Sequence, residues 1–302
     1  MRHLMIYRFI DAVAKAGSIR KAAEALTITP SALNRRILAI EDEMDVAIFE
    51  RLPRGVRLST AGELLIHNIR NHLADMDRVQ SQIADLSGVR RGHVSVASSQ
   101  ALLPFFLPRE IEKYRSEHPD VTFGVYVRDR EAAEQALVEY SADIALVFEP
   151  IRLSDFHTML TIRQPLFAVM AKAHPLAKSK IIRLTDCLSF PLALPSAPYG
   201  VRALLEAAAK RKSLSLPAAV QSDSFDFLLN FALTEQAISF QIQIGLPPEG
   251  GDSKFVSRPL ATRDVPAGFL HLGYLRGRAM PIAAARFADQ LVASFVANYD
   301  CV

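Results

Sequence analysis

The sequence predicts an α/β protein preceded by a mostly helical, winged helix-turn-helix segment. Two observations predict this fold class. Residues 4–44 carry three short amphipathic helical patterns, and two short strand patterns follow them. From residue 93 onward, apolar strands alternate with helices, which is the order that produces parallel sheets. We therefore divide the chain into a winged helix-turn-helix (1–60), a connecting helix (61–87) and α/β lobes (88–302).

The composition is that of a globular protein. Half of the 302 residues are apolar and the formal net charge is only +3, so affinity for a polyanion has to come from local clusters of charge. No apolar run reaches the roughly 18–20 residues that cross a bilayer, and the N-terminus lacks the apolar core of a signal peptide. Two cysteines, Cys187 and Cys301, are too few for a disulfide framework. We expect a cytoplasmic protein without a membrane partner.

The first helical patterns fit a helix-turn-helix. Residues 4–16 form an amphipathic helix that ends at Gly17, and residues 19–26 form a second, shorter helix. The paired alanines of the second helix, Ala22 and Ala23, let another helix cross closely. A third helix follows after a three-residue turn.

The third helix has Thr29 as its N-cap and Pro30 as its first residue. Its predicted buried stripe is Leu33, Ile37, Ile40 and Met44, and its opposite face carries Ser31, Asn34, Arg35 and Leu38. A hydroxyl, an amide and a guanidinium near a positive helix N-terminus are suited to reading bases in the DNA major groove. For an isolated helix an ordinary solvated face would be the simpler interpretation, and the segment that follows decides between the two.

That segment predicts a small basic wing. Residues 48–51 and 56–58 can pair around a turn at 53–55, and Arg51, Arg54 and Arg57 then line the ribbon. Arginines on a wing beside a reading helix add phosphate and minor-groove contacts. We expect Asn34 and Arg35 to contact base edges, while Arg54 and Arg36 hold phosphates.

The N-terminal sequence resembles the DNA-binding domain of LysR-type transcriptional regulators. The matching positions are Gly17-Ser18, Ala22-Ala23, Ile40-Glu41, residues 48–51 and residues 58–62. The resemblance implies binding to double-stranded promoter or operator DNA. Three departures bear on operator preference: Asn34 replaces a usual serine, Pro30 a common glutamine and Asp45 a usual glycine.

The connecting helix suggests self-association. Residues 61–86 contain no proline, and apolar residues recur at near-heptad spacing: Ile66, Ile69, Leu73, Met76, Val79, Ile83 and Leu86. The pattern favours a dimer seam, although a helix packed on its own domain would show a similar one. The resemblance implies a linker helix that pairs two subunits, and further pairing of dimers into tetramers through the effector lobes. Residues 87–92 are predicted to form a hinge.

The rest of the chain predicts two linked α/β lobes. Expected strands lie at 93–98, 121–127, 143–148, 165–171, 191–195, 218–222, 237–242 and 269–275, with helices between them and a closing helix at 281–299. This order resembles the effector domain of the same family, which has the periplasmic-binding-protein architecture. Lobe one then comprises residues 91–161 and 268–302, and lobe two residues 162–267.

Two strand-to-helix loops are the predicted effector site, because ligands of α/β lobes bind at the carboxyl ends of strands. The first loop precedes a helix expected to start near Leu102, and the second precedes a helix with a basic first turn. Helix N-termini and hydroxyl groups suit a small organic anion. The alternative is that the serines only cap their own helices. The predicted effector-binding residues are Ser98, Ser99, Gln100, Phe148, Ser196, Tyr199 and Arg202.

Other classes of function have less support in the sequence. Phosphate-loop, dinucleotide-binding and nucleophile-elbow motifs are absent, and the histidine spacing does not favour a metal site. Cys187 is expected to be a structural thiol, with a redox sensor as the alternative. The lobes alone would also permit a solute-binding protein or an enzyme. The winged N-terminus favours a transcriptional regulator controlled by a small molecule, with neither catalytic residues nor a cofactor.

Overall fold

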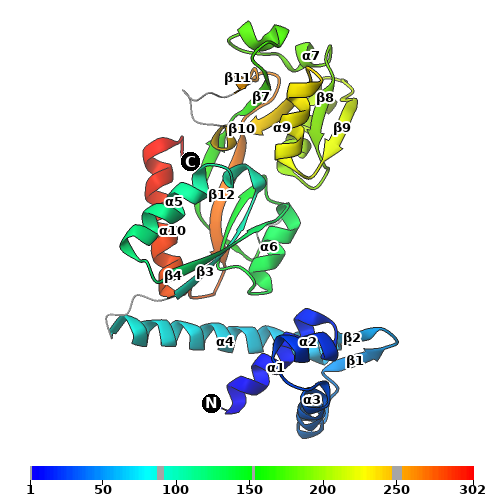
Figure 1. The fold of residues 1–302 in the computed structure, drawn as a ribbon, viewed down its shortest axis with the longest axis vertical. Coiled ribbons are helices and arrows are strands. Elements are labelled where there is room, and N and C mark those ends of the chain that lie inside the picture. The colour runs from blue at the N-terminus through cyan, green and yellow to red at the C-terminus, as the bar shows by residue number, and fades with distance from the viewer. Residues whose placement is uncertain (1, 87–91, 152–153, 247–253) are drawn as a thin grey trace. The chain divides into compact units, whose positions relative to one another are not determined.

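The computed structural model describes residues 2–86, 92–151, 154–246 and 254–302 (Figure 1). The chain divides into two compact units, Met1–Leu86 and Ser87–Val302. Each unit has a hydrophobic core of its own. None of the described helices is long and apolar enough to cross a membrane.

Three helices open the first unit, as predicted. Thr29 caps the third one, since its hydroxyl accepts a hydrogen bond from the Ala32 amide at 3.3 Å, and Pro30 is its first residue. Met44, expected on the buried stripe, is 47% exposed because the helix ends there. Leu33, Ile37 and Ile40 are buried as expected. The helices are α1 (Arg2–Ala16), α2 (Ile19–Ala25) and α3 (Pro30–Met44).

The predicted wing forms from antiparallel strands β1 (Phe49–Leu52) and β2 (Gly55–Leu58). Gly55 adopts a φ of +129°, and a Cβ there would lie 2.4 Å from the Gly17 carbonyl oxygen. The wing is therefore held tightly against the turn between α1 and α2. Glu41, on α3, fixes its other end by accepting hydrogen bonds from the backbone amides that lead into β1, at 2.8 and 2.9 Å.

The long helix α4 (Thr60–Leu86) packs along its first half against its own unit. Ile66 and Ile69 are buried in the core shared with α1, and Leu73 packs against that core. The dimer-seam prediction is wrong for Ile66 and Ile69, because α1 supplies apolar surface that the sequence pattern does not reveal. Arg70 adds a nearly buried ion pair to Asp11 of α1, at 2.9 Å.

The second half of α4 is different. Val79 is 39% exposed and Ile83 is 58% exposed. Large apolar side chains at helical spacing on an exposed face are typical of an interface with another chain. The predicted hinge at 87–92 lies outside the described residues except for Gly92, which begins a strand.

Two five-stranded sheets build the second unit (Figure 1). The sheet of lobe one has the order β4-β3-β5-β12-β6, and that of lobe two β11-β7-β10-β8-β9. The strands of lobe one are β3 (Gly92–Ser98), β4 (Val121–Val127), β5 (Ile144–Phe148), β6 (Phe156–Gln164) and β12 (Gly268–Leu275). Those of lobe two are β7 (Leu166–Ala171), β8 (Leu192–Pro195), β9 (Ala218–Ser222), β10 (Ile238–Ile242) and β11 (Phe255–Pro259).

The sheets are mixed rather than wholly parallel. β12 runs antiparallel to β5 and β6, and β7 runs antiparallel to β10 and β11. The chain crosses from lobe one to lobe two between β6 and β7 and returns before β12, so β7 and β12 enter their sheets from the opposite end. Neither β6 nor β11 was predicted from the sequence.

Helices pack around the two sheets. In lobe one, α5 and α10 pack together through stacked rings of Phe106 and Phe295, 4.6 Å apart. In lobe two, buried Asp264 accepts hydrogen bonds from the Leu184 amide at 3.1 Å and from Lys212 at 2.5 Å. The helices are α5 (Phe106–Glu117), α6 (Arg130–Val138), α7 (Leu184–Cys187), α8 (Gly200–Arg211), α9 (Phe225–Thr234) and α10 (Ile282–Asn298). Short 3-10 helices are η1 (Gln100–Leu102), η2 (Pro175–Lys178) and η3 (Gln243–Gly245).

Candidate functional site

The face of α3 that was predicted to read DNA is accessible. Ser31 and Arg35 are exposed, Leu38 is 41% exposed and Asn34 is half-buried. Ser31 lies within 3.3 Å of the Thr29 hydroxyl at the helix N-terminus. Arg35 makes no hydrogen bond or ion pair with any described residue, so its guanidinium is available to an external ligand.

A hydrogen bond joins the wing to this face. Nη2 of Arg51 donates to Oδ1 of Asn34 at 2.8 Å. A guanidinium has only donors, so the amide must turn its oxygen toward Arg51 and its NH2 group away. The two residues are 17 positions apart, and only the folded hairpin brings them together.

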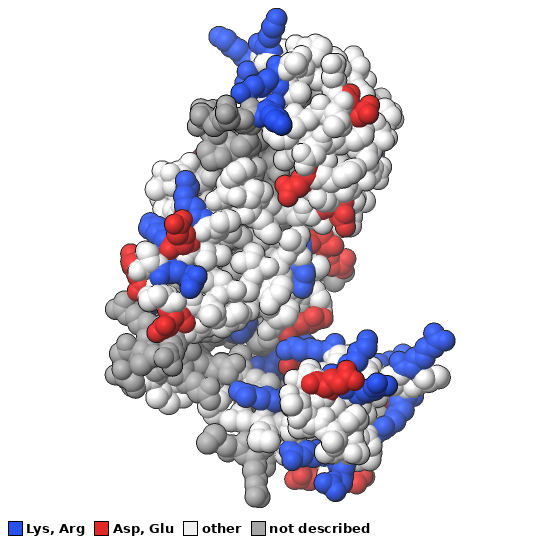
Figure 2. All heavy atoms as spheres, in the orientation of Figure 1, with Lys and Arg blue, Asp and Glu red and all other residues white. Residues whose placement is uncertain are grey.

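The other basic residues of this region have distinct environments. The Arg36 guanidinium lies over the ring of Phe9 on α1, 4.9 Å from its centroid, and thus on a different side of α3 from the reading face. Arg57 pairs with Glu50 across the wing at 2.7 Å. Arg54 is exposed at the turn between the two strands. Basic side chains gather on this unit in Figure 2.

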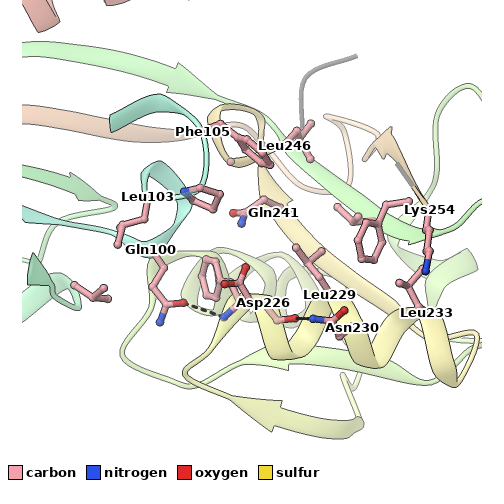
Figure 3. Close-up of a pocket in the computed structure, with 16 residues that line it drawn as sticks. Gln100, Leu103, Phe105, Asp226, Leu229, Asn230, Leu233, Gln241, Leu246 and Lys254 are labelled. Atoms are coloured by element: carbon pink, nitrogen blue, oxygen red, sulfur yellow. Dashed lines mark hydrogen bonds between the residues drawn. The ribbon is translucent and has the colours of Figure 1, made fainter. Parts of the chain in front are cut away.

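The second unit contains a cavity of about 750 Å³ between its lobes (Figure 3). Its walls are mainly apolar, and its few polar groups include Asp226, Asn230 and Gln241. Lys254 is the cation among the described lining residues. The remaining lining residues are Gln100, Leu103, Pro104, Phe105, Val127, Val169, Phe225, Leu229, Leu233, Gly245, Leu246 and Phe255.

Gln100 connects the two lobes at this cavity. Its Oε1 accepts a hydrogen bond from the Phe225 amide at 2.9 Å, at the start of α9 (Figure 3). Its Nε2 donates to the Tyr199 hydroxyl at 3.3 Å and also to the Asp223 carbonyl. The predicted residues Gln100 and Tyr199 thus meet. The side chain of Gln100, from lobe one, uses both its oxygen and its nitrogen to bind groups of lobe two.

The first predicted loop departs from expectation. Ser99 precedes only the single turn of η1 and makes no capping bond with its side chain. The expected helix starting near Leu102 is wrong: α5 begins at Phe106, because the residue before Pro104 is disfavoured in a helix. Ser98 is fully buried and its hydroxyl donates to the Ser99 carbonyl at 3.1 Å.

The second loop is also only partly as expected. Phe148 is buried against Gly200, where a Cβ would meet its ring at 2.8 Å, so it is a core residue and not the wall of the cavity. Arg202 pairs with Glu206 at 2.5 Å and lines a separate groove, away from the cavity. Ser196 is half-buried, and its described hydrogen bonds come from its backbone.

The sequence pattern did not reveal the main wall of the cavity. α9 supplies Asp226, Leu229, Asn230 and Leu233, at spacings of three, one and three residues along one helix face. A helix was expected over this stretch from the sequence. Which of its faces would line a cavity depends on how α9 packs on the sheet.

Cys187 has the environment of a structural thiol. It is fully buried and lies 3.6 Å from the Arg183 carbonyl. Burial, with a smaller contribution from the charge of Asp186, raises the pKa of the Cys187 thiol to about 12. A thiol with so high a pKa is a poor nucleophile near neutral pH. Within the described part of the chain, His, Cys, Asp and Glu form no group of three or more that could hold a metal ion.

Comparison with known families assigns both units. Residues 5–63 match the bacterial regulatory helix-turn-helix protein, lysR family, and residues 87–296 match the LysR substrate binding domain. The chain belongs to the LysR family. It is therefore a DNA-binding transcriptional regulator with an effector-binding domain, and not an enzyme.

LysR-family relatives match over much of the chain. The HTH-type transcriptional activator CmpR of Synechocystis sp. is 24% identical over 300 residues, covering 97% of this chain and 96% of the relative. A RuBisCO operon transcriptional regulator of Allochromatium vinosum is 27% identical over 199 residues, covering 66% of each chain.

Solved LysR-family structures share the fold. A full-length OxyR variant from Pseudomonas aeruginosa matches with a TM-score of 0.74 at 18% identity, covering 95% of this chain and 94% of that one. CbnR complexed with its target DNA matches with a TM-score of 0.62 at 17% identity, covering 96% and 99%.

Proposed function

We propose that the exposed face of α3 enters the major groove of operator DNA, with Asn34 and Arg35 at base edges and Arg54 on a phosphate. The observation that carries this proposal is the accessible face itself, on which Arg35 has no described partner and the wing lies beside the reading residues. A helix in the groove flanked by a wing on the backbone is an established docking geometry.

A gel-shift titration with full-length protein tests this assignment. Arg35→Ala should weaken binding to the operator by about 1–3 kcal/mol and relax base preference, while Arg54→Ala should weaken binding to all sequences and reduce the salt dependence. Arg211→Ala removes one charge from an exposed position on α8 and serves as the control. Unchanged operator affinity of Arg35→Ala would mean that the reading face is misassigned.

The Arg51 hydrogen bond limits what Asn34 can read. With its oxygen turned toward Arg51, the amide presents its NH donors to a base, and these fit the acceptors of guanine or the O4 of thymine. The paired donor and acceptor that asparagine usually presents to adenine would require that oxygen. We therefore expect Asn34 to favour a base that presents acceptors.

A small organic anion between the lobes is the effector that we propose for the second unit. The cavity has a suitable volume of about 750 Å³, mainly apolar walls and one cation, Lys254, for a carboxylate or phosphate. Gln100 lines this cavity and ties the lobes together. Ser99 and Ser196 do not line it and remain predicted contacts only. A ligand there could change how the lobes are held.

Thermal-shift screening of the full chain against small aromatic and aliphatic carboxylates and phosphates, followed by calorimetry on a confirmed ligand, tests this site. Lys254→Gln and Leu229→Asp should each weaken binding about tenfold or more, since they remove the cation or place a like charge in the apolar wall. Arg202→Gln, outside the cavity, is the control. Unchanged affinity in both cavity variants would place the effector elsewhere.

Self-association is proposed to use the second half of α4, where Val79 and Ile83 are exposed, with the lobes pairing dimers into tetramers. Leu73 is unsuitable as a probe because it packs against the core of its own unit, so a charge there would also destabilise that unit. Val79→Asp with Ile83→Asp should lower the molar mass in light scattering, with exposed Leu64→Asp as the control. Retention of the full mass by the double variant would argue for another interface. We also propose a cytoplasmic location, because the family consists of DNA-binding transcriptional regulators.

A further inference from the structure

We propose that the second unit has another ligand site, a basic cavity for a small polyanion that carries two or more phosphate or carboxylate groups. This basic cavity has a volume of about 950 Å³. It lies between α5 and the end of α10 in lobe one, and η2 and β11 in lobe two. Leu246 also lines the effector cavity, but none of the polar residues is shared between the two.

Four cationic side chains line the basic cavity, namely Arg109, Lys178, Lys180 and Arg258. Its described lining includes no aspartate or glutamate, and none of the four cations forms an ion pair with a described residue. Figure 2 shows basic side chains gathered on lobe two. Surface cations usually alternate with acids, so four unbalanced charges around one hollow mark a place for an external anion.

Arg258 is the most firmly held of the four. Its Nε donates to the Ala177 carbonyl at 2.9 Å and its Nη1 to the Ser257 carbonyl at 3.0 Å, and the residue is half-buried. These bonds leave both N–H groups of Nη2 and one of Nη1 without a described protein acceptor. Because Ala177 lies in η2, the same bonds hold β11 beside the turn that carries Lys178. The Arg258 guanidinium and the backbone that carries Lys178 are thus positioned before a ligand arrives.

Lobe one contributes the opposite wall, with Arg109 and Tyr299. Burial raises the pKa of the Tyr299 hydroxyl, and the nearby Arg109 charge lowers it by a smaller amount. The Tyr299 hydroxyl therefore stays protonated and can donate a hydrogen bond to an anion. A ligand that contacts Tyr299 and Arg258 together would link the two lobes.

The four cations of the basic cavity favour a ligand that carries more than one negative charge. The cavity is open and its lysines are exposed, so a single negative charge would be strongly screened. Two or three linked anionic groups can contact several cations at once, and a volume of about 950 Å³ accommodates a molecule of metabolite size. Polyphosphates and polycarboxylates both have this chemistry, and binding of inorganic triphosphate or of citrate distinguishes the two classes.

Calorimetry on the full chain tests the proposal, with inorganic triphosphate and citrate as the two probes at about 0.15 M salt. Lys178→Gln with Lys180→Gln removes two exposed charges that make no described side-chain bond. The matched control is Arg211→Gln with Arg263→Gln, which removes two exposed charges of the same unit outside the cavity. We expect at least about tenfold weaker binding in the lysine variant and less than about twofold change in the control.

The outcomes are distinct. Triphosphate binding alone selects a phosphorylated ligand, citrate alone a polycarboxylate, and similar binding a site for multiple charges of either kind. The proposal is overturned if neither probe binds the wild type, or if both variants weaken binding equally. It also fails if the lysine variant changes the molar mass in light scattering while anion affinity stays the same, because the cluster would then be a subunit contact. Leu229→Asp, which alters only the effector cavity, should leave triphosphate binding intact.

Discussion

Removal of the Arg51 guanidinium should change which base the protein prefers, beyond weakening its hold on DNA. The bond from Arg51 to Asn34 is 2.8 Å long and takes one of the two lone pairs of the amide oxygen, so it holds that oxygen toward the wing. In Arg51→Ala that oxygen is released, and Asn34 can present both a donor and an acceptor to adenine. A well-formed bidentate contact of this kind contributes about 1–3 kcal/mol of discrimination. Adenine should therefore gain roughly 5- to 150-fold over guanine at the position that Asn34 reads.

The assay is selection from a randomised operator library, followed by titration of single-base variants. Arg54→Ala is the matched control, since it removes an arginine from the same wing without touching Asn34. Both variants should lose overall affinity, because each loses a positive charge near the backbone. Only Arg51→Ala should change the ranking of bases, and Asn34→Ala should abolish the difference. An identical ranking for Arg51→Ala and Arg54→Ala would refute the reasoning.

Three further predictions concern stability and reactivity. Asp45 ends α3 with a left-handed φ of 51°, so Asp45→Gly should stabilise the first unit by about 1 kcal/mol, measured as a higher urea midpoint; a lower midpoint would contradict this. The hydrogen bond from Lys212 lowers the pKa of Asp264, so this contact stabilises the fold above the ordinary carboxyl pKa of about 4 and is lost as the pH falls through the lower folded value. Lys212→Met should cost about 2–4 kcal/mol at neutral pH and flatten that acid dependence, whereas an unchanged urea midpoint would show that the pair is unimportant. Cys187 should resist iodoacetamide in the folded protein, and rapid labelling detected by mass spectrometry would show that its thiol is accessible.

Local chemistry explains which parts of the fold the sequence could predict. Thr29 and Pro30 fix the start of α3 through interactions within one helical turn, so that boundary was predictable. β11 was missed because its partner, β7, lies far away in the chain and the strand itself is short and only half-buried. The mixed direction of the sheets likewise depends on the crossings between lobes, which no local pattern encodes.

The candidate site residues divide in the same way, into those that a local pattern predicts and those that only the tertiary packing determines. Ser31, Arg35 and Leu38 were predictable because the period of one helix separates its exposed face from its buried stripe. The Asn34–Arg51 bond required the register of the wing, and the apolar wall of the effector cavity required the packing of α9. Arg202 was expected near the effector because it follows the second loop, but it pairs with its i+4 neighbour Glu206 and lines a separate groove.

The packing of α4 makes this helix a lever for the DNA-reading surface. Its 27 residues span about 40 Å. Because Ile66, Ile69 and the Arg70–Asp11 pair fix its first half to α1, the reading helix has to follow any tilt of α4 as one rigid piece. A tilt of about 5° over that length displaces one end by roughly 3–4 Å, which is close to the rise of one base pair. In the dimer that we propose through α4, a small change in how the two helices cross would change the spacing between the DNA half-sites that the dimer can bind.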